Sequence, residues 1–467
     1  MAALLTAAAC ATTPAAPPAN PEPAAPAPSD HVQPPPFQAT PDAGNRQKAD
    51  DARTANHRAI FDAAWRLVRD KHYDKTLGGV DWEAQRKKYQ PLALAAPSEA
   101  SFYRTVNQMI GELGQSHMMI RGPGSDDDEE EERSAAGGDA AAFQQAITGI
   151  GDPGLTVRMI ENRPTITAIR PGSSAERQGL LPGFIVTHIG GRDIRVPAEP
   201  PRPLRPVEER FALRRLAQQR LTGPVGSKVT ITFLDNDDRA GEAMLVRDPP
   251  RTPPVRFGHV SFLSPEVRVH QLRDVAVLSF NIFLLEPVMA EIKKAIAGIR
   301  ARGSRALIID LRGNPGGHGS MSIPVAALLV EEPLTLGTLH FRDFNNVLSA
   351  RPQAGSPPFT GPVAILTDEG TASASEILAA GLQEAKRAVV VGDATLGAVL
   401  PSVVESLPGG AVLQYVVADF KTPKGVVLEG RGVQPDRRVI ETRAGLKTGR
   451  DPVLDAALVA VRASRAK

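Results

Sequence analysis

The chain has 467 residues, of which 42% are hydrophobic; it is long for one domain, so we expect two or three domains with buried cores. Its formal net charge is only +2 and its aromatic content only 4%, which indicates neither a phosphate-tracking surface nor a base-stacking platform. Nucleic acid is therefore not an expected partner.

The N-terminal segment contains the single cysteine, Cys10, at the end of the apolar run in LLTAAACATT. One cysteine excludes an intramolecular disulfide, and no stretch reaches the ~20 apolar residues of a membrane-spanning helix. The run resembles the end of a bacterial lipoprotein signal, although it lacks a basic start and Ala7 replaces a larger aliphatic residue. The alternative is an Ala-rich start with an incidental cysteine.

A Pro- and Ala-rich stretch follows the cysteine, and its composition is typical of a linker. We therefore expect residues 1–51 to be a signal remnant and linker, lipidated at Cys10. The predicted location is the bacterial envelope, either periplasmic or membrane-anchored, with the lipid as the only membrane contact.

Apolar residues at helical spacing predict a small helical domain over residues 52–122, with a turn at Gly78-Gly79. The residues that carry this spacing are Ile60, Phe61, Ala64, Trp65 and Val68, then Phe102, Val106, Met109, Ile110 and Leu113. The domain ends in GELGQSHMMI. The acidic run SDDDEEEER then predicts a solvated, flexible loop over residues 123–143. A calcium site is less favoured there, because consecutive carboxylates lack the spaced ligands and turn glycine of a binding loop, so no metal is expected.

Residues 144–249 contain short β-rich runs around an Arg-rich helical insert. The stretch ITAIRPGSSAERQGLLPGFIVTHIGGRDI resembles a PDZ domain, and Gly149, Ile150 and Gly151 precede it. The sequence departs from that pattern at Phe184, where an acidic residue is usual, and in a Pro-rich insert around 197–206. A PDZ-like module would capture an extended peptide by strand addition, with backbone amides of the Gly-rich turn holding its carboxylate. The alternative is a β-rich spacer without a ligand.

From about residue 250 to 467, apolar strands alternate with helices, which predicts an α/β domain with a parallel sheet. The strand 306–311 leads into RGNPGGHGS, and the strand 363–367 leads into DEGTASASEIL at the start of a helix. Chemistry is expected at the carboxyl ends of such strands. Backbone N–H groups of the two turns, side by side, would form an oxyanion hole for a carbonyl attacked by a serine at the helix start. The alternative is that Ser373 and Ser375 only cap the helix.

Three motifs, LIIDLRGNPGG, TASASEILAAGLQEAKRAVVVGDATLG and FKTPKGVVLEGRGVQPD, occur in this order. In that order they resemble the core of the tail-specific, C-terminal processing serine peptidases, over residues 55 to 440. The resemblance implies a PDZ-like domain joined to a crotonase-like (ClpP-like) α/β core. It also implies that Ser373 is the nucleophile, that Ala374 gives one oxyanion amide, and that Gly316 or Gly317 gives the other. Ser375 would be structural.

The expected catalytic base differs between two branches of that family. The Ser-Lys branch has a Lys after the TxG turn, where this chain has Ala398, which cannot accept a proton. The other branch resembles tricorn protease, and GQSH and LEGRGVQPD supply the residues that it needs: Ser116, His117 and Glu429. In that branch His117 would take the proton of Ser373, with Ser116 and Glu429 orienting it. Imidazole suits base work at neutral pH because its ordinary pKa is near 6.5.

Other residues remain rivals for the base: His318 beside the Gly-rich loop, and, more weakly, Lys421 and Lys424. A catalytically inactive PDZ and crotonase-like protein that binds peptides or other ligands is the alternative function, and a crotonase-type acyl-CoA enzyme is disfavoured. As a serine endopeptidase the protein would act on polypeptides and need no cofactor. The sequence does not indicate its oligomeric state.

Overall fold

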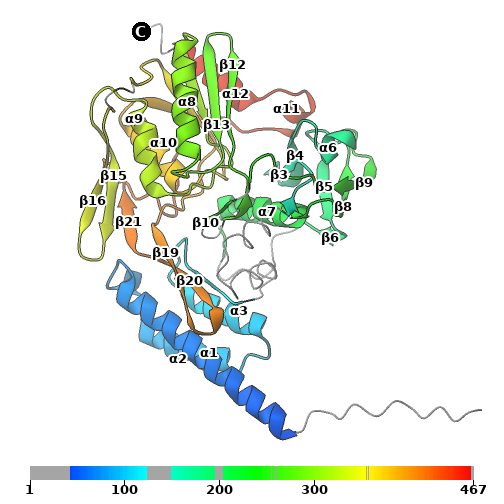
Figure 1. The fold of residues 1–467 in the computed structure, drawn as a ribbon, viewed down its shortest axis with the longest axis vertical. Helices are drawn as coiled ribbons and strands as arrows, with labels where there is room; N and C mark the ends of the chain where they lie inside the picture. The colour runs from blue at the N-terminus through cyan, green and yellow to red at the C-terminus, as the bar shows by residue number, and fades with distance from the viewer. Residues whose placement is uncertain are drawn as a thin grey trace, which may run out of the picture. The chain divides into compact units, whose positions relative to one another are not determined.

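The computed structural model describes residues 43–123, 149–194, 203–253, 255–257, 260–353, 355 and 357–463 (Figure 1). Cys10, the expected signal and linker up to residue 42, and nearly all of the expected acidic loop lie outside the described residues. The chain divides into two units, Met1–Asp51 and Ala52–Lys467, and every described element except the start of α1 lies in the second unit. None of the described helices has the length and apolar content needed to cross a membrane.

The N-terminal helices form their own hydrophobic cluster. They are α1 (Ala43–Lys71), η1 (Leu77–Gly79), α2 (Trp82–Leu94) and α3 (Glu99–Gly111). The helices confirm the helix prediction, and all of the residues that predicted them are buried except Leu113, which is partly buried and follows α3. α1 begins earlier than expected: its first nine residues, 43–51, belong to the segment predicted as linker. A three-stranded antiparallel sheet completes the cluster: β1 (Met119–Arg121), β20 (Val412–Val416) and β19 (Ser402–Ser406).

A second hydrophobic cluster joins an antiparallel sheet to one long helix, α7 (Pro206–Leu221). The strands are β3 (Leu155–Ile160), β4 (Arg163–Ile169), β5 (Ile185–Ile189), β6 (Arg192–Asp193), β8 (Lys228–Leu234) and β9 (Ala240–Val246), with the short α6 (Ser174–Arg177) beside them. A separate two-stranded ladder joins β2 (Ile150–Gly151) to β7 (Gly223–Pro224). Among the described strands, β3 lies at one edge of the larger sheet and pairs with β4.

The largest sheet has the order β12-β13-β14-β17-β18-β22. Its strands are β12 (Val267–Leu272), β13 (Val275–Phe280), β14 (Ala306–Asp310), β17 (Val363–Thr367), β18 (Ala388–Gly392) and β22 (Arg437–Arg438). Every pairing is parallel except that of β12 with β13, which confirms the predicted parallel sheet.

Helices cover both faces of this sheet, as Figure 1 shows. One face packs against α8 (Val288–Ala301), α9 (Ser322–Ala327) and α10 (Ala374–Glu384), and the other packs against α12 (Pro452–Ala463). Successive residues of one strand point to opposite faces, so Leu307 and Ile309 of β14 join the first cluster and Ile308 joins the second. Burial on both faces explains why these strands read as continuous apolar runs.

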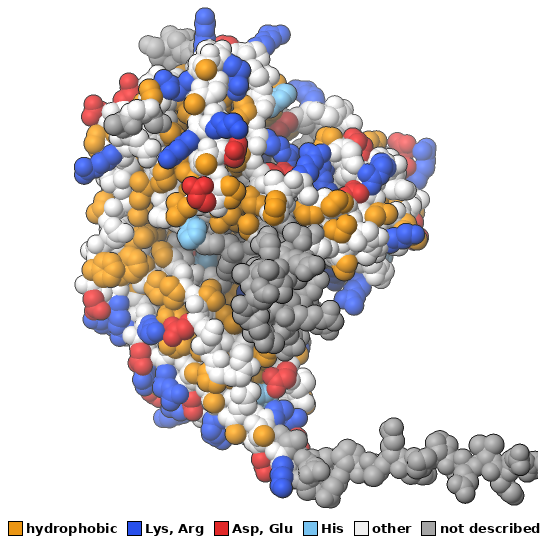
Figure 2. Space-filling view, in the orientation of Figure 1, with side chains coloured by type: hydrophobic (Ala, Val, Ile, Leu, Met, Phe, Trp, Pro, Cys, Tyr) orange, Lys and Arg blue, Asp and Glu red, His pale blue; other side chains and the backbone are white. Residues whose placement is uncertain are grey.

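The remaining elements border this core. They are β10 (Val255–Phe257), β11 (Val260–Leu263), η2 (Gly319–Met321), β15 (Leu334–Phe341), β16 (Asn345–Ala350), η3 (Pro408–Gly410), β21 (Ala418–Lys421) and α11 (Arg443–Lys447). β15 pairs with both β16 and β21, and hydrophobic side chains gather over the β15–β16 hairpin in Figure 2, where Phe344 and Val347 are exposed. Basic and acidic side chains are interspersed on the face that Figure 2 shows.

Two neighbouring strands of the large sheet position the candidate site. β14 and β17 are hydrogen-bonded in parallel from Leu307↔Val363 to Asp310↔Leu366, so their carboxyl ends meet at the same edge. The turns that follow them are the two Gly- and Ser-containing turns identified in the sequence. The fold is therefore mixed α/β, and it brings these turns together.

Candidate active site

Ser373 lies at the junction of the turn after β17 and helix α10, in a backbone conformation that side chains rarely adopt. Its φ of 55° and ψ of −120° fall in a region favoured by glycine. Strain of this kind persists only where the surroundings hold it, and it concentrates at functional sites. A serine on such a sharp strand-to-helix turn presents its Oγ outward from the sheet.

The three hydroxyl groups of this turn have different surroundings. Ser375 Oγ donates to the carbonyl oxygen of Asn314 at 3.0 Å, and Thr371 Oγ1 donates to that of Leu311 at 2.8 Å. Both side chains are completely buried, whereas Ser373 is only half-buried. Ser375 and Thr371 therefore join the two turns, and Ser373 is the hydroxyl left open to a substrate.

Gly316 lies directly against the start of helix α10. A Cβ added to Gly316 would lie 2.7 Å from Ser373 Cβ and 2.9 Å from the backbone nitrogen of Ala374, so only glycine fits. The Gly316 N–H donates to Asn314 Oδ1 at 2.9 Å. Among the described residues, neither the Gly317 N–H nor the Ala374 N–H has a hydrogen-bond acceptor. The pair of amides with free donors is thus Ala374 and Gly317 rather than Ala374 and Gly316.

Ser116, His117 and Glu429 form one hydrogen-bonded chain, although Glu429 is far from the other two in sequence. Glu429 Oε1 accepts the backbone N–H of Ser116 at 2.8 Å, and its Oε2 accepts the Ser116 hydroxyl at 3.1 Å. Ser116 Oγ also lies 2.8 Å from His117 Nδ1. Because the one hydroxyl proton goes to Glu429, Ser116 Oγ accepts the Nδ1–H of His117. In this tautomer Nε2 carries a lone pair in the ring plane and can accept a proton.

Burial changes the pKa values of His117 and Glu429. It lowers the pKa of His117 to about 4, so the imidazole is neutral at neutral pH. It also raises the pKa of Glu429, although the donors from Ser116 and Val399 act in the opposite direction. A neutral imidazole is the form that a general base requires.

A contact with a buried histidine holds the turn that carries His117. Gln115 Oε1 lies 2.7 Å from Nε2 of His72, which is fully buried just beyond the end of α1. His117 itself has a φ of 56°, which is uncommon for a residue with a side chain. The sequence carried the GQSH motif but no signal for the contact with His72.

Two backbone contacts link this chain to the serine turn. The Ser373 N–H donates to the carbonyl oxygen of Ala398 at 2.9 Å, and the next residue, Val399, donates its N–H to Glu429 Oε2 at 3.0 Å. Residues 398–399 therefore join the two halves of the candidate site. Ala398 is buried, and its side chain offers no proton acceptor.

The other residues singled out in the sequence belong to other segments. His318 is exposed after the Gly-rich loop, Lys424 is exposed, and Lys421 lies in β21, paired with Thr338. In the predicted peptide-binding segment, Ile150 and Gly151 form β2, and the carbonyl oxygen of Gly149 accepts the Val225 N–H at 2.6 Å. Part of the polar backbone of that segment is thus already paired.

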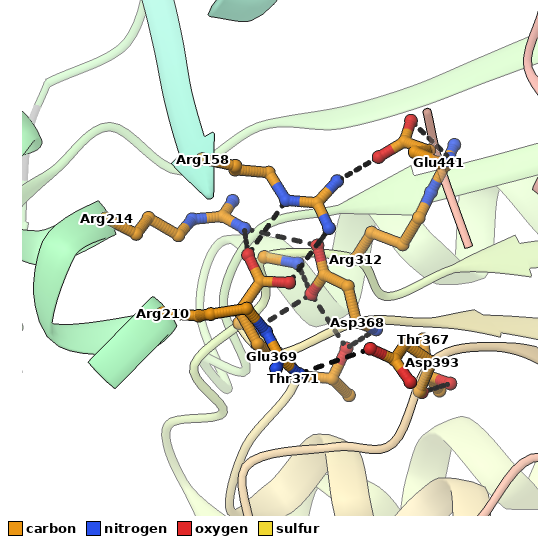
Figure 3. Close-up of polar contacts among 12 residues, drawn as sticks. Arg158, Arg210, Arg214, Arg312, Thr367, Asp368, Glu369, Thr371, Asp393 and Glu441 are labelled. Atoms are coloured by element: carbon orange, nitrogen blue, oxygen red, sulfur yellow. Dashed lines mark hydrogen bonds and ion pairs between the residues drawn. The ribbon is translucent and has the colours of Figure 1, made fainter. Parts of the chain in front are cut away.

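A cluster of arginines, which the sequence reading did not single out, holds the turn before Ser373 (Figure 3). Arg158 of β3 donates to both carboxylate oxygens of Glu369 at 2.8 and 2.9 Å, and Arg214 of α7 donates to Asp368 at 3.2 Å. Burial would raise the pKa of Asp368, but the charges of Arg158 and Arg214 outweigh it and lower the pKa to about 2. The antiparallel sheet region is therefore ion-paired to the turn 368–371.

The helix α7 also makes apolar contact with the candidate site. Its Val207 and Phe211 pack against Ala372, Leu396 and Ala398. The cavity beside this contact, about 430 Å³, is lined by charged side chains from β3, α7 and the core, among them Arg158, Arg210, Arg312, Asp393 and Glu441. No group of His, Cys, Asp and Glu that could hold a metal ion occurs within the described residues.

Comparison with known families identifies the class of protein. Residues 274–439 match peptidase family S41, and residues 53–111 match the tricorn protease C1 domain. These two matches agree with the resemblance that the sequence motifs indicated, and they support a serine-type peptidase with one region similar to peptidase family S41 and one similar to the tricorn protease C1 domain.

Individual relatives fit this class. The chain is 26% identical over 377 residues to a carboxyl-terminal-processing protease of Synechocystis sp., covering 80% of this chain and 79% of that protein. It is 28% identical over 419 residues to a putative tricorn protease homolog 2 of Streptomyces coelicolor, covering 86% of this chain and 32% of that longer protein. The solved photosystem II D1 C-terminal processing protease shares the fold, with a TM-score of 0.54 and 21% identity over 82% of this chain and 93% of that one.

Proposed function

We propose that the protein is an endopeptidase that cleaves polypeptides through an acyl-enzyme on Ser373. The observation that carries this proposal is the hydrogen-bonded chain of Glu429, Ser116 and His117, which leaves His117 Nε2 as a neutral base. A nucleophile, a base and a group that orients the base make up the arrangement that acyl transfer requires.

The steps follow from these groups. Ser373 Oγ bonds to the carbonyl carbon of the scissile peptide while its proton passes to His117 Nε2. The adduct then breaks its C–N bond, and the proton on Nε2 passes to the leaving amine. A water molecule then bonds to the ester carbon while one of its protons passes to Nε2. The C–Oγ bond breaks, the proton on Nε2 returns to Ser373 Oγ, and the new carboxyl terminus is released. The Ala374 and Gly317 N–H groups stabilise the negative oxygen of each adduct, a contribution worth about 100- to 1000-fold per donor.

Substrate would enter in extended form. In this proposal residues 144–249 are a PDZ-like domain, residues 250–467 a crotonase-like core, and residues 52–122 an N-terminal helical domain. β3 is an edge strand beside α7, so an extended peptide can pair with its free edge. The amides near Gly149–Gly151 would hold a C-terminal carboxylate. Lipidation at Cys10 and export remain part of the proposal, and no cofactor takes part.

The test is covalent labelling by a fluorophosphonate together with hydrolysis of casein. We expect wild type to be labelled on Ser373 and to hydrolyse casein, and we expect Ser373→Ala, His117→Ala and Glu429→Gln to lose activity. His318→Ala is the matched control, because it removes a histidine near the same turn. Labelling retained in Ser373→Ala, or activity lost only in His318→Ala, would contradict the proposal.

A further inference from the structure

Glu376, in the first turn of α10, has a carboxylate that is completely buried and accepts four hydrogen bonds. Oε2 accepts the backbone N–H groups of Ser373 at 2.9 Å and Ala398 at 3.0 Å. Oε1 accepts the backbone N–H of Gly397 at 2.8 Å and the Thr395 hydroxyl at 2.5 Å. No role has been given to this side chain so far. Among the described residues it has no cation partner, and burying a carboxylate in this way is costly.

All four partners are donors, which fits only an ionised carboxylate. Thr395 Oγ1 accepts the backbone N–H of Val433 at 2.7 Å, so its own proton points to Glu376. An ionised carboxylate has about four acceptor sites on two oxygens, and here two donors reach each oxygen. Burial raises the pKa of Glu376 to about 7, although these donors favour the charged form. Replacing one oxygen by an NH₂ group would set it against two donors.

The four donors belong to the two segments that meet at the candidate site. One is the N–H of Ser373 itself, held in a conformation with φ of 55°. The others come from residues 395–398, and the next residue, Val399, donates to Glu429. One carboxylate thus joins the backbone of the nucleophile to the segment that supports the base.

We propose that Glu376 is a positioning residue: its carboxylate fixes the backbone of Ser373 against residues 395–398 and thereby sets the distance between the nucleophile and His117. It touches neither substrate nor the reacting atoms. The inference rests on the proposed function, since it assumes that Ser373 is the nucleophile. It predicts an effect on the chemical step and little effect on substrate binding, because none of the four donors to Glu376 belongs to β3 or α7.

The experiment compares Glu376→Gln with Glu384→Gln in the full chain. Glu384 is a matched control, because it lies on the same helix and also accepts a threonine hydroxyl, from Thr422 at 2.7 Å, and a backbone N–H, from Lys424 at 2.9 Å. We expect Glu376→Gln to lower kcat about 100-fold, the cost of displacing a reacting group by about 1 Å. KM should change less than about 3-fold, since ground-state binding is not touched. Glu384→Gln should keep the kcat of wild type.

Two readouts separate positioning from a general loss of structure. The rate constant for fluorophosphonate labelling is measured on the fraction of molecules that remains folded, and a positioning role lowers that rate constant itself. If Glu376→Gln fails to fold, Thr395→Val and Thr395→Ser decide instead. Thr395→Val removes the hydroxyl donor and is expected to lower kcat about 10-fold, equivalent to about one hydrogen bond, whereas Thr395→Ser keeps it.

The inference is overturned if Glu376→Gln keeps kcat within about 3-fold of wild type, or if its loss equals the loss of folded protein. Equal activity in Thr395→Val and Thr395→Ser would also overturn it. Failure of the proposed function looks different: Ser373→Ala would then be labelled as fast as wild type, and the inference would fall with it.

Discussion

The two halves of the candidate site are built in different ways. Ser373 follows a completely buried strand and begins a buried helix, so the core of the large sheet holds it locally. His117 follows α3 of the N-terminal helices, and its orientation depends on Glu429 and Val399 from the other end of the chain. The proposed nucleophile is thus part of a packed core, whereas the proposed base is oriented by a few polar contacts between distant segments. A change at one half should leave the other half folded, which makes the comparison testable.

The largest effect is expected for Ser373→Ala. Removal of the nucleophile should lower kcat by about 10⁶-fold, as for other nucleophilic serines that act as a unit with a base. Because the small side chain fits the buried turn, the thermal unfolding temperature should stay close to that of wild type. Differential scanning calorimetry and casein hydrolysis measure both. Residual labelling at another serine would contradict the assignment.

His117→Ala should act on catalysis alone. Loss of a general base costs typically 10²- to 10⁴-fold, so we expect the fluorophosphonate labelling rate to fall by about that factor while Ser373 remains the modified residue. Tandem mass spectrometry identifies the modified site. A labelling rate like that of wild type would show that another group, such as His318, takes the proton.

Arg158→Ala tests the ion pairs between β3 and the turn before Ser373. It leaves Glu369 and Asp368, both buried, without this partner, and breaking a buried pair typically costs about 3–5 kcal/mol of unfolding free energy. Arg239→Ala is the control from the same sheet region, because Arg239 is exposed and forms its ion pair with exposed Asp237. Urea denaturation measures both variants. Equal, small losses would show that the contact contributes little to stability.

Glu429→Gln should weaken the orientation of the base without removing it. The single amide oxygen cannot accept all three donors from Ser116 and Val399, so we expect kcat to fall about 10- to 100-fold, as for outer partners of catalytic groups. Val404→Ala, an exposed change on β19, is the control for general effects on this region. An unchanged kcat would exclude Glu429 from the mechanism.

The smallest effect is a pH dependence of stability. The pKa of Asp368 is lowered from 3.8 to about 2, so its ion pairs stabilise the folded state fully above pH 3.8, and this contribution is lost as the pH falls through 2. The shift corresponds to roughly 2 kcal/mol. The stability difference between wild type and Arg158→Ala should therefore shrink between pH 4 and pH 2 in urea titrations. A difference that stays constant over this range would contradict the pairing.

The sequence predicted the surroundings of Ser373 better than the contacts that orient His117. The strand 306–310, the strand 363–367 and the helix after Ser373 were expected, because burial on both faces gives continuous apolar runs with glycine turns between them. The adjacency of the two turns followed from the parallel sheet. The proposed base, His117, and its partners Ser116 and Glu429 came from the family resemblance, because no local sequence pattern links Glu429 to Ser116.

Other features could not be predicted, for physical reasons. Arg158 and Arg214 occur in a β-strand and a helix where a charged residue is ordinarily solvated, and their partners come from a distant turn. Glu376 was not singled out in the sequence, because a glutamate in the first turn of a helix is common. The start of α1 at Ala43, within the expected linker, was not predicted, because the ends of helices are hard to locate from sequence. The proposal of Gly317 rather than Gly316 as an oxyanion donor depends on the hydrogen bond that Asn314 Oδ1 accepts from the Gly316 N–H, which no sequence pattern indicates.

The most direct test of the account is a crystal structure of the fluorophosphonate adduct. The account predicts the phosphorus on Ser373 Oγ, a phosphonyl oxygen bound by the N–H groups of Ala374 and Gly317, and His117 Nε2 within about 2.6–3.2 Å of Ser373 Oγ. A His117 ring well beyond hydrogen-bond reach of Ser373 Oγ, with His318 or a lysine in its place, would contradict it.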